Sequence, residues 1–325
     1  MRDFDYVVPK SLDEALTRGK NPDHRFIAGG TLLVDLVRLD VERPAAIVDL
    51  NAVLSGHIRW ASNGLTVGAL AKNSDLADHP DVKRELPALS QALDSGASPQ
   101  IRNMASLGGN LMQRTRCPYF RDPGVSECNK RKPGSGCAAL EGYSRMHAVL
   151  GASDSCIAVH PSDLCVALLA LDAVVRTRRS SGARELPIGD FHTLPGETPD
   201  IETQLEPGEI VTEVFVPASG FSRRSAYVKV RDRASFAFAL ASAAVALELS
   251  GEKISGARVA LGGVATKPWR ALEVEAALLG RPPTRQTFEA AAKLAANGAR
   301  TTPYNQFKVE LARRVVVSAL ERAAT

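Results

Sequence analysis

Cysteines are the residues of this chain whose type and spacing most clearly point to chemistry. Four of its five cysteines fall in one polar stretch: Cys117, Cys128, Cys137 and Cys156. The stretch is rich in glycine, proline and charged residues, and it shows neither helical nor strand periodicity. A loop of this composition and length buries too little apolar surface to order itself. Thiolates around an inorganic centre would order it.

The spacing of these four cysteines limits which inorganic centre they could bind. Neighbouring members are 11, 9 and 19 residues apart, whereas structural zinc sites usually contain a C-x₂₋₄-C pair. Disulfides are disfavoured by the odd number of cysteines and by the lack of a recognisable secretory signal peptide. Four thiolates from a wrapping loop can hold an iron–sulfur cluster. We therefore favour a [4Fe–4S] cluster, with zinc-bound and metal-free loops as open alternatives.

The charges near the cysteines suit such a cluster, which carries net negative charge when four thiolates hold it. Basic residues outnumber the two nearby acids, Asp122 and Glu127. The basic residues are Arg114, Arg116, Arg121, Lys130, Arg131 and Lys132. The fifth cysteine, Cys165, lies in the apolar run 164–169. We expect it to be an ordinary buried cysteine and not a ligand.

Two glycine-rich segments lie upstream of the cysteine loop. The first, Ile27-Ala28-Gly29-Gly30-Thr31, falls between a predicted strand and a predicted helix, and the second is Ser106-Leu107-Gly108-Gly109-Asn110. Glycines at such a turn let the backbone approach a phosphate, and the following helix favours an anion. Neither segment has the G-x-G-x-x-G spacing of a Rossmann fingerprint. A tight turn that needs glycine for steric reasons alone is the plainer interpretation.

Three units along the chain must position these segments. The first fifty residues are predicted to form a compact βαβαβ unit. Its strands are expected at 6–8, 25–28 and 46–50, and its helices at 11–19, where Ser11 and Glu14 form a capping box, and at 31–39. The Asn63-Gly64 pair then predicts a hairpin of 57–60 with 65–68. Further elements are expected at 81–93 (helix), from Pro161-Ser162-Asp163 onward (buried helix), at 173–178 and at 210–216 (strands).

The C-terminal part shows a different pattern, with long apolar strands followed by amphipathic helices. Strands are expected at 241–249 and 254–264, and helices at 272–279, 286–296 and 304–323. We place the boundary near Phe221–Arg224. The predicted organisation is therefore α+β. Its units are 1–55, 56–220 with the cysteine-rich loop at about 114–160, and an α+β domain at 221–325.

Composition excludes several classes of protein. Among 325 residues, 40 basic and 36 acidic side chains leave a net charge of +4, which is too mild to indicate nucleic-acid binding. No apolar run is long enough to span a membrane, since the stretch 164–175 is interrupted by Asp172. Without a signal peptide of its own, the chain is expected in the cytoplasm. It would be periplasmic if exported folded with a partner that carries the signal.

The two glycine segments, the second within Gln100–Asn110, resemble the FAD-binding (medium) subunit of the xanthine dehydrogenase family of molybdenum hydroxylases. The resemblance covers essentially the whole chain, including Pro207–Val211 and Tyr227–Arg231. The cysteine loop is similar to that of bacterial periplasmic-type aldehyde oxidoreductases whose flavin subunit carries an extra [4Fe–4S] cluster. The resemblance implies a flavoprotein fold of two α/β subdomains that bind FAD, followed by a C-terminal α+β domain.

The resemblance also implies which residues hold FAD. The pyrophosphate would be wrapped by Ile27, Ala28, Gly29, Gly30, Thr31, Leu32, Leu33 and Val34. A second cradle would comprise Ser106, Leu107, Gly108, Gly109 and Asn110. Asp163 would bond the dinucleotide, Val211 would pack near it, and Lys229 would lie at the flavin edge. Each of the three residues also has a plainer interpretation. Asp163 could be an acid at a helix N-terminus beside Ser162, Val211 a core strand residue, and Lys229 a surface lysine.

On this resemblance the chain passes electrons and carries no catalytic acid or base. Substrate would be oxidised at molybdenum in a large partner subunit, and a small [2Fe–2S] subunit would complete a heterotrimer. Electrons would leave the FAD for an external acceptor, and no second dinucleotide motif indicates NAD. One alternative is the flavin subunit of an aromatic acyl-CoA reductase or another molybdenum hydroxylase. Others are a stand-alone flavoprotein oxidase with His147 or His160 as base, and an iron–sulfur electron-transfer or assembly protein without flavin.

The basic run Lys130-Arg131-Lys132 lies between two proposed ligands. One hypothesis is that it docks an acidic electron-transfer protein such as a ferredoxin by electrostatic steering. The alternative is a solvated loop whose charge only balances the cluster.

Overall fold

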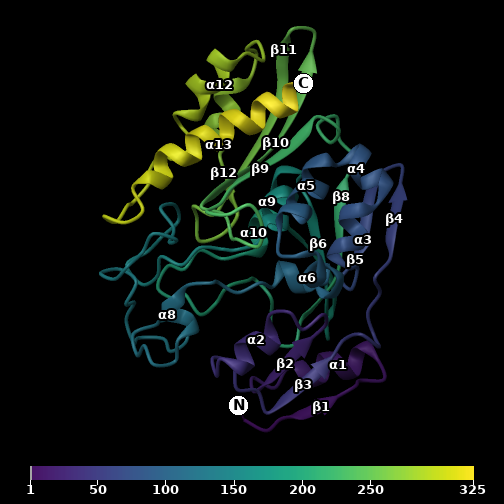
Figure 1. Ribbon diagram of the computed structural model, residues 1–325. Coiled ribbons are helices and arrows are strands. Elements are labelled where there is room, and N and C mark those ends of the chain that lie inside the picture. Colours follow the sequence, from purple (N-terminus) through teal and green to yellow (C-terminus); the bar gives the residue numbers. More distant parts are fainter. Residues whose placement is uncertain (1) are drawn as a thin grey trace.

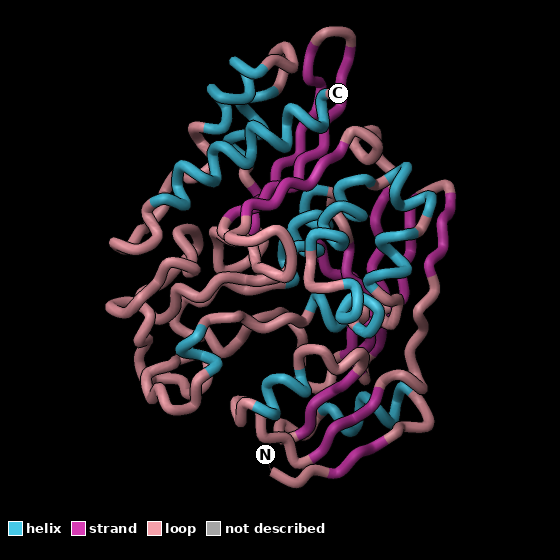
Figure 2. The backbone as a smooth tube through the Cα atoms, viewed as in Figure 1, coloured by secondary structure: helices cyan, strands magenta, loops and turns pink. Residues whose placement is uncertain are grey.

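The computed structural model describes residues 2–325, whose strands form three sheets (Figures 1 and 2). The first is parallel, in the order β1 (Asp5–Val7), β3 (Ala46–Asp49), β2 (His24–Ile27), and its connections contain α1 (Leu12–Gly19) and α2 (Leu33–Arg38). This confirms the predicted βαβαβ unit. Helix α1 begins as the capping box predicts, because Ser11 Oγ accepts the Glu14 N–H at 3.2 Å.

The middle sheet is antiparallel and has the order β4-β5-β8-β6-β7. Its strands are β4 (Ile58–Ala61), β5 (Gly64–Gly68), β8 (Ile210–Pro217), β6 (Val174–Arg179) and β7 (Gly182–Pro187). The hairpin predicted around Asn63-Gly64 is β4–β5. Strand β7 was not predicted, because its side chains alternate between partly buried and exposed positions without an apolar face.

Short helices connect and cover this sheet: α3 (Asn73–Asp78), α4 (Pro80–Glu85), α5 (Pro87–Ser95), α6 (Pro99–Met104), α7 (Leu107–Leu111), α9 (Asp163–Ala170) and α10 (Ile188–Phe191). The single helix expected at 81–93 is divided into α4 and α5, because Pro87 cannot continue a helix from Leu86. Helix α9 is buried throughout, and α5 and α9 both also pack against the third sheet. The N-terminus of α9 therefore lies between two sheets.

The third sheet is antiparallel, in the order β12 (Trp269–Arg270), β11 (Lys253–Gly262), β10 (Ala241–Ser250), β9 (Ser225–Val230). Helix α13 (Phe307–Ala324), yellow in Figure 1, lies along β10 and β9, with α11 (Leu272–Leu278) and α12 (Arg285–Ala292) beside it. These elements enclose a core of their own. The α+β fold predicted from the sequence is confirmed.

The cysteine-rich stretch is almost entirely loop, as its lack of periodicity predicts (Figure 2). Its one helix is α8 (Pro118–Arg121). Across residues 2–325, no helix combines the length and the apolar character that a membrane crossing requires.

A fully buried lysine makes the stability of the fold depend on pH. Lys308 in α13 is 0% exposed, and its ammonium donates to Met146 O at 3.1 Å and Gly263 O at 2.6 Å. Burial, with a smaller effect of the Arg145 charge, lowers its pKa from 10.5 to about 7. Between these values the unfolded chain binds one more proton than the folded chain. Stability therefore rises as the pH increases through this window.

We expect Lys308→Met to remove this rise. Urea unfolding of wild type and variant at pH 7.5, 8.5 and 9.5 should show a wild-type free energy that climbs relative to the variant. The difference is limited to about 1.4 kcal/mol per pH unit. If the unfolding free energies of wild type and variant changed in parallel with pH, the lowered pKa assigned to Lys308 would be contradicted.

Candidate functional site

The cavity that both glycine segments line, here called the main cavity, has a volume of about 650 Å³. It lies where the N-terminal unit, the middle domain and the cysteine loop meet. The end of β2 and the turn into α2 form one side, and the start of α7 another. The remaining sides come from the segment 156–161, from 192–205 and from the beginning of β8.

Both glycine segments line this cavity. A Cβ on Gly29 would lie 2.0 Å from Met104 O, so only glycine permits the close approach of α6 to the first segment. Gly30 has φ of +71°, a conformation that favours glycine. In the second segment, Ser106 Oγ accepts the Gly109 N–H at 3.2 Å and caps α7. A Cβ on Gly109 would contact only that hydroxyl, so its other side is open.

Most residues expected to bind FAD line the main cavity. They are Ile27, Ala28, Gly29, Gly30, Thr31, Leu32, Leu33, Ser106, Gly108, Gly109 and Val211. Three others point elsewhere. Val34 is 47% exposed on α2, and Leu107 is buried in the middle core. Asn110 Oδ1 accepts the Ser162 hydroxyl at 2.7 Å and so ties α7 to the start of α9.

Asp163 and Lys229 lie outside the main cavity and form a buried ion pair. The Lys229 ammonium donates to Asp163 Oδ2 at 2.7 Å and to Ser95 O at 2.9 Å, and its side chain is 3% exposed. The Tyr227 hydroxyl donates to the other carboxylate oxygen. Burial, together with this carboxylate, raises the pKa of Tyr227 well above 10. The interpretation of Lys229 as a surface lysine is therefore wrong.

A second cavity of about 180 Å³ contains Asp163 in its lining. Cys117 and His147 also line it, so it separates the ion pair from the cysteine loop. Thr115 and the segment 159–161 border both cavities. The two spaces are therefore neighbours that share one stretch of chain.

All four cysteines of the loop line one small cavity. Cys128 and Cys137 pair as an isolated antiparallel bridge, and Cys156 lines the main cavity as well. Cys165 lies apart, in the core of α9. Within residues 2–325, the one group of three or more metal-ligating atoms within 4.8 Å of one another excludes these cysteines. The four sulfurs thus gather without the tight spacing that a single ion requires.

The surroundings of these thiols are largely dry. Burial raises the pKa of Cys117 to about 12 and also raises that of Cys156. The Ala158 N–H donates to Cys156 Sγ at 3.4 Å, and His147 Nε2 lies 3.1 Å from Cys117 Sγ.

The basic run of the loop is not freely solvated, in contrast to one expectation for it. Arg131 donates to the carbonyls of Tyr119, Phe120, Asp122 and Val125 and so holds the loop together. Lys130 donates to Pro199 O at 2.7 Å and to Glu202 at 2.9 Å. Lys132 alone of the three is exposed.

A charged network at the edge of the main cavity had no signal in the sequence. Arg114 donates to Glu42 and Glu202, each at 2.5 Å, and lies over the Phe120 ring. Burial acts against ionisation of Glu202, but the charges of Arg114 and Lys130 hold its pKa below the usual value. These partners are far apart in the chain and belong to no motif. Only the folded chain shows that the network joins the N-terminal unit to the cysteine loop.

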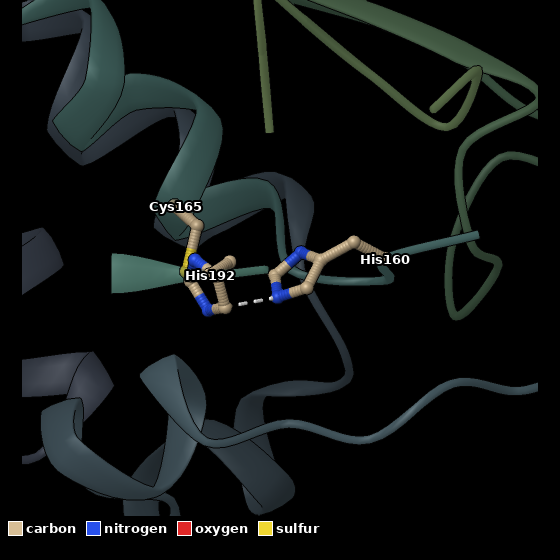
Figure 3. Close-up of side chains that lie close together, drawn as sticks. All are labelled: His160, Cys165 and His192. Carbon is tan, nitrogen blue, oxygen red and sulfur yellow. Dashed lines mark hydrogen bonds between the residues drawn. The ribbon is translucent and has the colours of Figure 1, made fainter. Parts of the chain in front are cut away.

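His160, Cys165 and His192 form the group of close ligating atoms (Figure 3). His192 Nε2 lies 3.0 Å from Leu111 O, which only accepts, so this nitrogen carries the proton; it also lies 3.2 Å from His160 Nε2. Burial lowers the pKa of His192 to about 4 and raises that of Cys165 to about 12. The charges of Lys130 and Lys267 act on the two histidines in the same direction as burial. We interpret the group as a neutral, hydrogen-bonded cluster in a positive field that disfavours a cation.

Comparison with known proteins matches two family models to the chain. The model of the FAD binding domain in molybdopterin dehydrogenase matches residues 2–219. The model of the CO dehydrogenase flavoprotein C-terminal domain matches residues 225–323.

Relatives and solved structures agree with these models. The chain is 47% identical over 326 residues to the aldehyde oxidoreductase FAD-binding subunit PaoB of Escherichia coli (strain K12), with 99% of both chains covered. It is 30% identical over 282 residues to the glyceraldehyde dehydrogenase medium chain of Sulfolobus acidocaldarius, covering 86% of this chain and 82% of the relative. A carbon monoxide dehydrogenase structure from Hydrogenophaga pseudoflava superposes with a TM-score of 0.76 at 26% identity, covering 99% of this chain and 97% of that one. The chain therefore belongs to the FAD-binding medium subunits of the molybdenum hydroxylase family, and it is an oxidoreductase subunit.

Proposed function

We propose that this chain is the FAD- and [4Fe–4S]-carrying electron-transfer subunit of a molybdenum-cofactor aldehyde oxidoreductase. The observation that carries the proposal is the gathering of Cys117, Cys128, Cys137 and Cys156 at one cavity, with Cys156 also bordering the main cavity. The choice of an aldehyde as substrate rests on the relative with 47% identity. The flavin subunit of an aromatic acyl-CoA reductase is the alternative within the family, because a partner would set the substrate.

The main cavity fits FAD through its two glycine segments. Helix α2 begins without a side-chain cap, and its Val34 N–H donates to Gly30 O at 3.1 Å, which holds the turn of the first segment. Gly109 leaves open a space that a side chain would fill. Ile27 to Leu33 would hold the pyrophosphate, and Ser106, Gly108 and Gly109 would face it. Asp163 would act from the second cavity, and Lys229 would act through its ion pair with Asp163.

The cysteine cavity fits a cluster better than a zinc ion. Four thiolates at about 2.3 Å from one zinc ion would lie about 3.8 Å from one another. The sulfurs of this loop do not come within 4.8 Å in groups of three among the described residues. Arg114 and Lys130 lie near the site, and Glu42 and Glu202 balance their charges.

FAD exchanges one or two electrons, whereas a [4Fe–4S] cluster exchanges one. Together they would connect a one-electron transfer with a two-electron transfer. The chain's own residues bind the two groups, orient them and keep water from the thiols. Of the two histidines considered as a base for a stand-alone oxidase, His160 lines the main cavity and His147 lines the second cavity. His160 contacts His192, and His147 faces Cys117.

The proposal includes a heterotrimer with a large molybdenum subunit and a small [2Fe–2S] subunit. An acidic acceptor such as a ferredoxin remains part of the proposal. Lys132 is the residue of the basic run that is free to meet it, because Lys130 and Arg131 bond within the protein.

The test compares two cysteines of opposite expected role. Cys156→Ser should lower iron and acid-labile sulfide by about four atoms each per chain relative to wild type. Cys165→Ser should leave both unchanged, because Cys165 lies in the core of α9. Wild-type protein should also show flavin absorption with a broad iron–sulfur shoulder. Loss of iron in the Cys165 variant alone would refute the ligand assignment, and wild type without iron would refute the cluster.

A further inference from the structure

A histidine from outside the four-cysteine set contacts one of its members. His147 is 2% exposed, and its Nε2 lies 3.1 Å from Cys117 Sγ. Its other ring nitrogen, Nδ1, is buried and has no hydrogen-bond partner. A thiolate sulfur bound to iron accepts hydrogen bonds and donates none. With Cys117 as a ligand, the proton of the His147 ring is therefore on Nε2.

The backbone around His147 is fixed by elements outside the cysteine loop. The His147 N–H donates to Ser144 O at 2.9 Å, and the Ser144 hydroxyl pairs with that of Thr302 at 2.7 Å. Two residues on, the Val149 N–H donates to Val264 O at 2.8 Å, which ties this segment to the end of β11. The C-terminal domain thus holds the imidazole against the thiol.

The same contact faces the second cavity. Cys117 and His147 both line it, and Asp163 lines its other part. Of the four cysteines, Cys117 is the one in the lining of this cavity. The hydrogen bond therefore involves the cysteine that shares a cavity with Asp163, the residue expected to bond the dinucleotide.

We propose that His147 is a positioning residue for the cluster, whose Nε2–H donates to the Cys117 thiolate and raises the reduction potential. A donor withdraws electron density from the sulfur and stabilises the more negative, reduced state. The inference rests on the proposed [4Fe–4S] cluster and adds a residue that sets its electron affinity.

The experiment uses the full chain co-expressed with its partner subunits. His147→Phe keeps a ring of similar size but lacks the donor. A redox titration followed by electron paramagnetic resonance should show the reduced-to-oxidised ratio at a fixed potential falling about tenfold, a shift of about 59 mV for one electron. His147→Gln restores an N–H at similar reach and should recover most of the shift.

A matched control is Tyr119→Phe. Its hydroxyl donates to Tyr143 O in the same loop, and its ring lies 6.0 Å from that of His147. This variant should keep the wild-type potential. Full iron content with an unchanged potential in His147→Phe would overturn the inference and leave the proposed function standing. A wild-type complex without a [4Fe–4S] resonance would instead overturn the proposed function. Should His147→Phe lose its cluster, His147→Gln decides: a wild-type potential supports the donor role and a tenfold shift contradicts it.

Discussion

Gly109→Leu is expected to abolish FAD retention while the fold survives. Gly109 lies in α7 with ordinary helical geometry, where leucine is a better helix former than glycine. Its Cβ would meet only Ser106 Oγ, at 3.0 Å. Gly109 lines the main cavity, so we expect the rest of the side chain to occupy space assigned to the cofactor. We expect affinity for FAD to fall at least about a hundredfold, or about 2.7 kcal/mol.

The measurement is fluorescence titration of flavin-free protein with FAD, with circular dichroism to confirm the fold. Gly109→Ala adds one methyl group and should give an intermediate loss. Gly30→Leu is a poorer probe, because φ of +71° makes any side chain strained there whether or not flavin binds. Wild-type affinity in a folded Gly109→Leu protein would remove the second glycine segment from the site.

Asp163→Ala is expected to destabilise the chain even without flavin. Lys229, whose side chain is 3% exposed, would lose its carboxylate partner and keep only Ser95 O. Removing one member of a buried ion pair typically costs about 3–5 kcal/mol. The Tyr227 hydroxyl would lose its acceptor as well. We expect a loss of stability of this size in urea unfolding of flavin-free protein.

A double variant tests whether the unpaired Lys229 causes this loss of stability. Asp163→Ala with Lys229→Met removes the orphaned charge, so it should recover a large part of the lost stability. If Asp163 only bound the cofactor, its replacement would leave the stability of flavin-free protein unchanged. Flavin-free Asp163→Ala with wild-type stability, and a defect that appears only on FAD titration, would contradict the structural role described for this pair.

Local patterns in the sequence predicted much of the fold. Ser11 with Glu14 marked the start of α1, Asn63-Gly64 marked the β4–β5 hairpin, and Ser162 marked the start of α9. Each of these signals depends only on residues that are close together in the chain, so it can be recognised from the sequence alone. Strand β7 carries no such signal, because its position at the sheet edge leaves neither face fully buried.

The parts of the candidate site that consist of short sequence motifs could be predicted. The parts formed by residues far apart in the chain could not. The glycine segments and the cysteines stand out by type and spacing. Nothing in the sequence pairs Lys229 with Asp163, brings Glu42 and Glu202 to Arg114, or turns Arg131 toward four carbonyls. Such contacts depend on tertiary packing between units that are far apart in the chain, which no local pattern records.

The run from Cys156 to Pro161 has a consequence for changes made in the cysteine loop. Members of this run border the cysteine cavity, the second cavity and the main cavity. One stretch of six residues thus contributes to the walls of three cavities. A change that displaces Cys156 is therefore expected to alter the shape of the main cavity as well as that of the cysteine cavity.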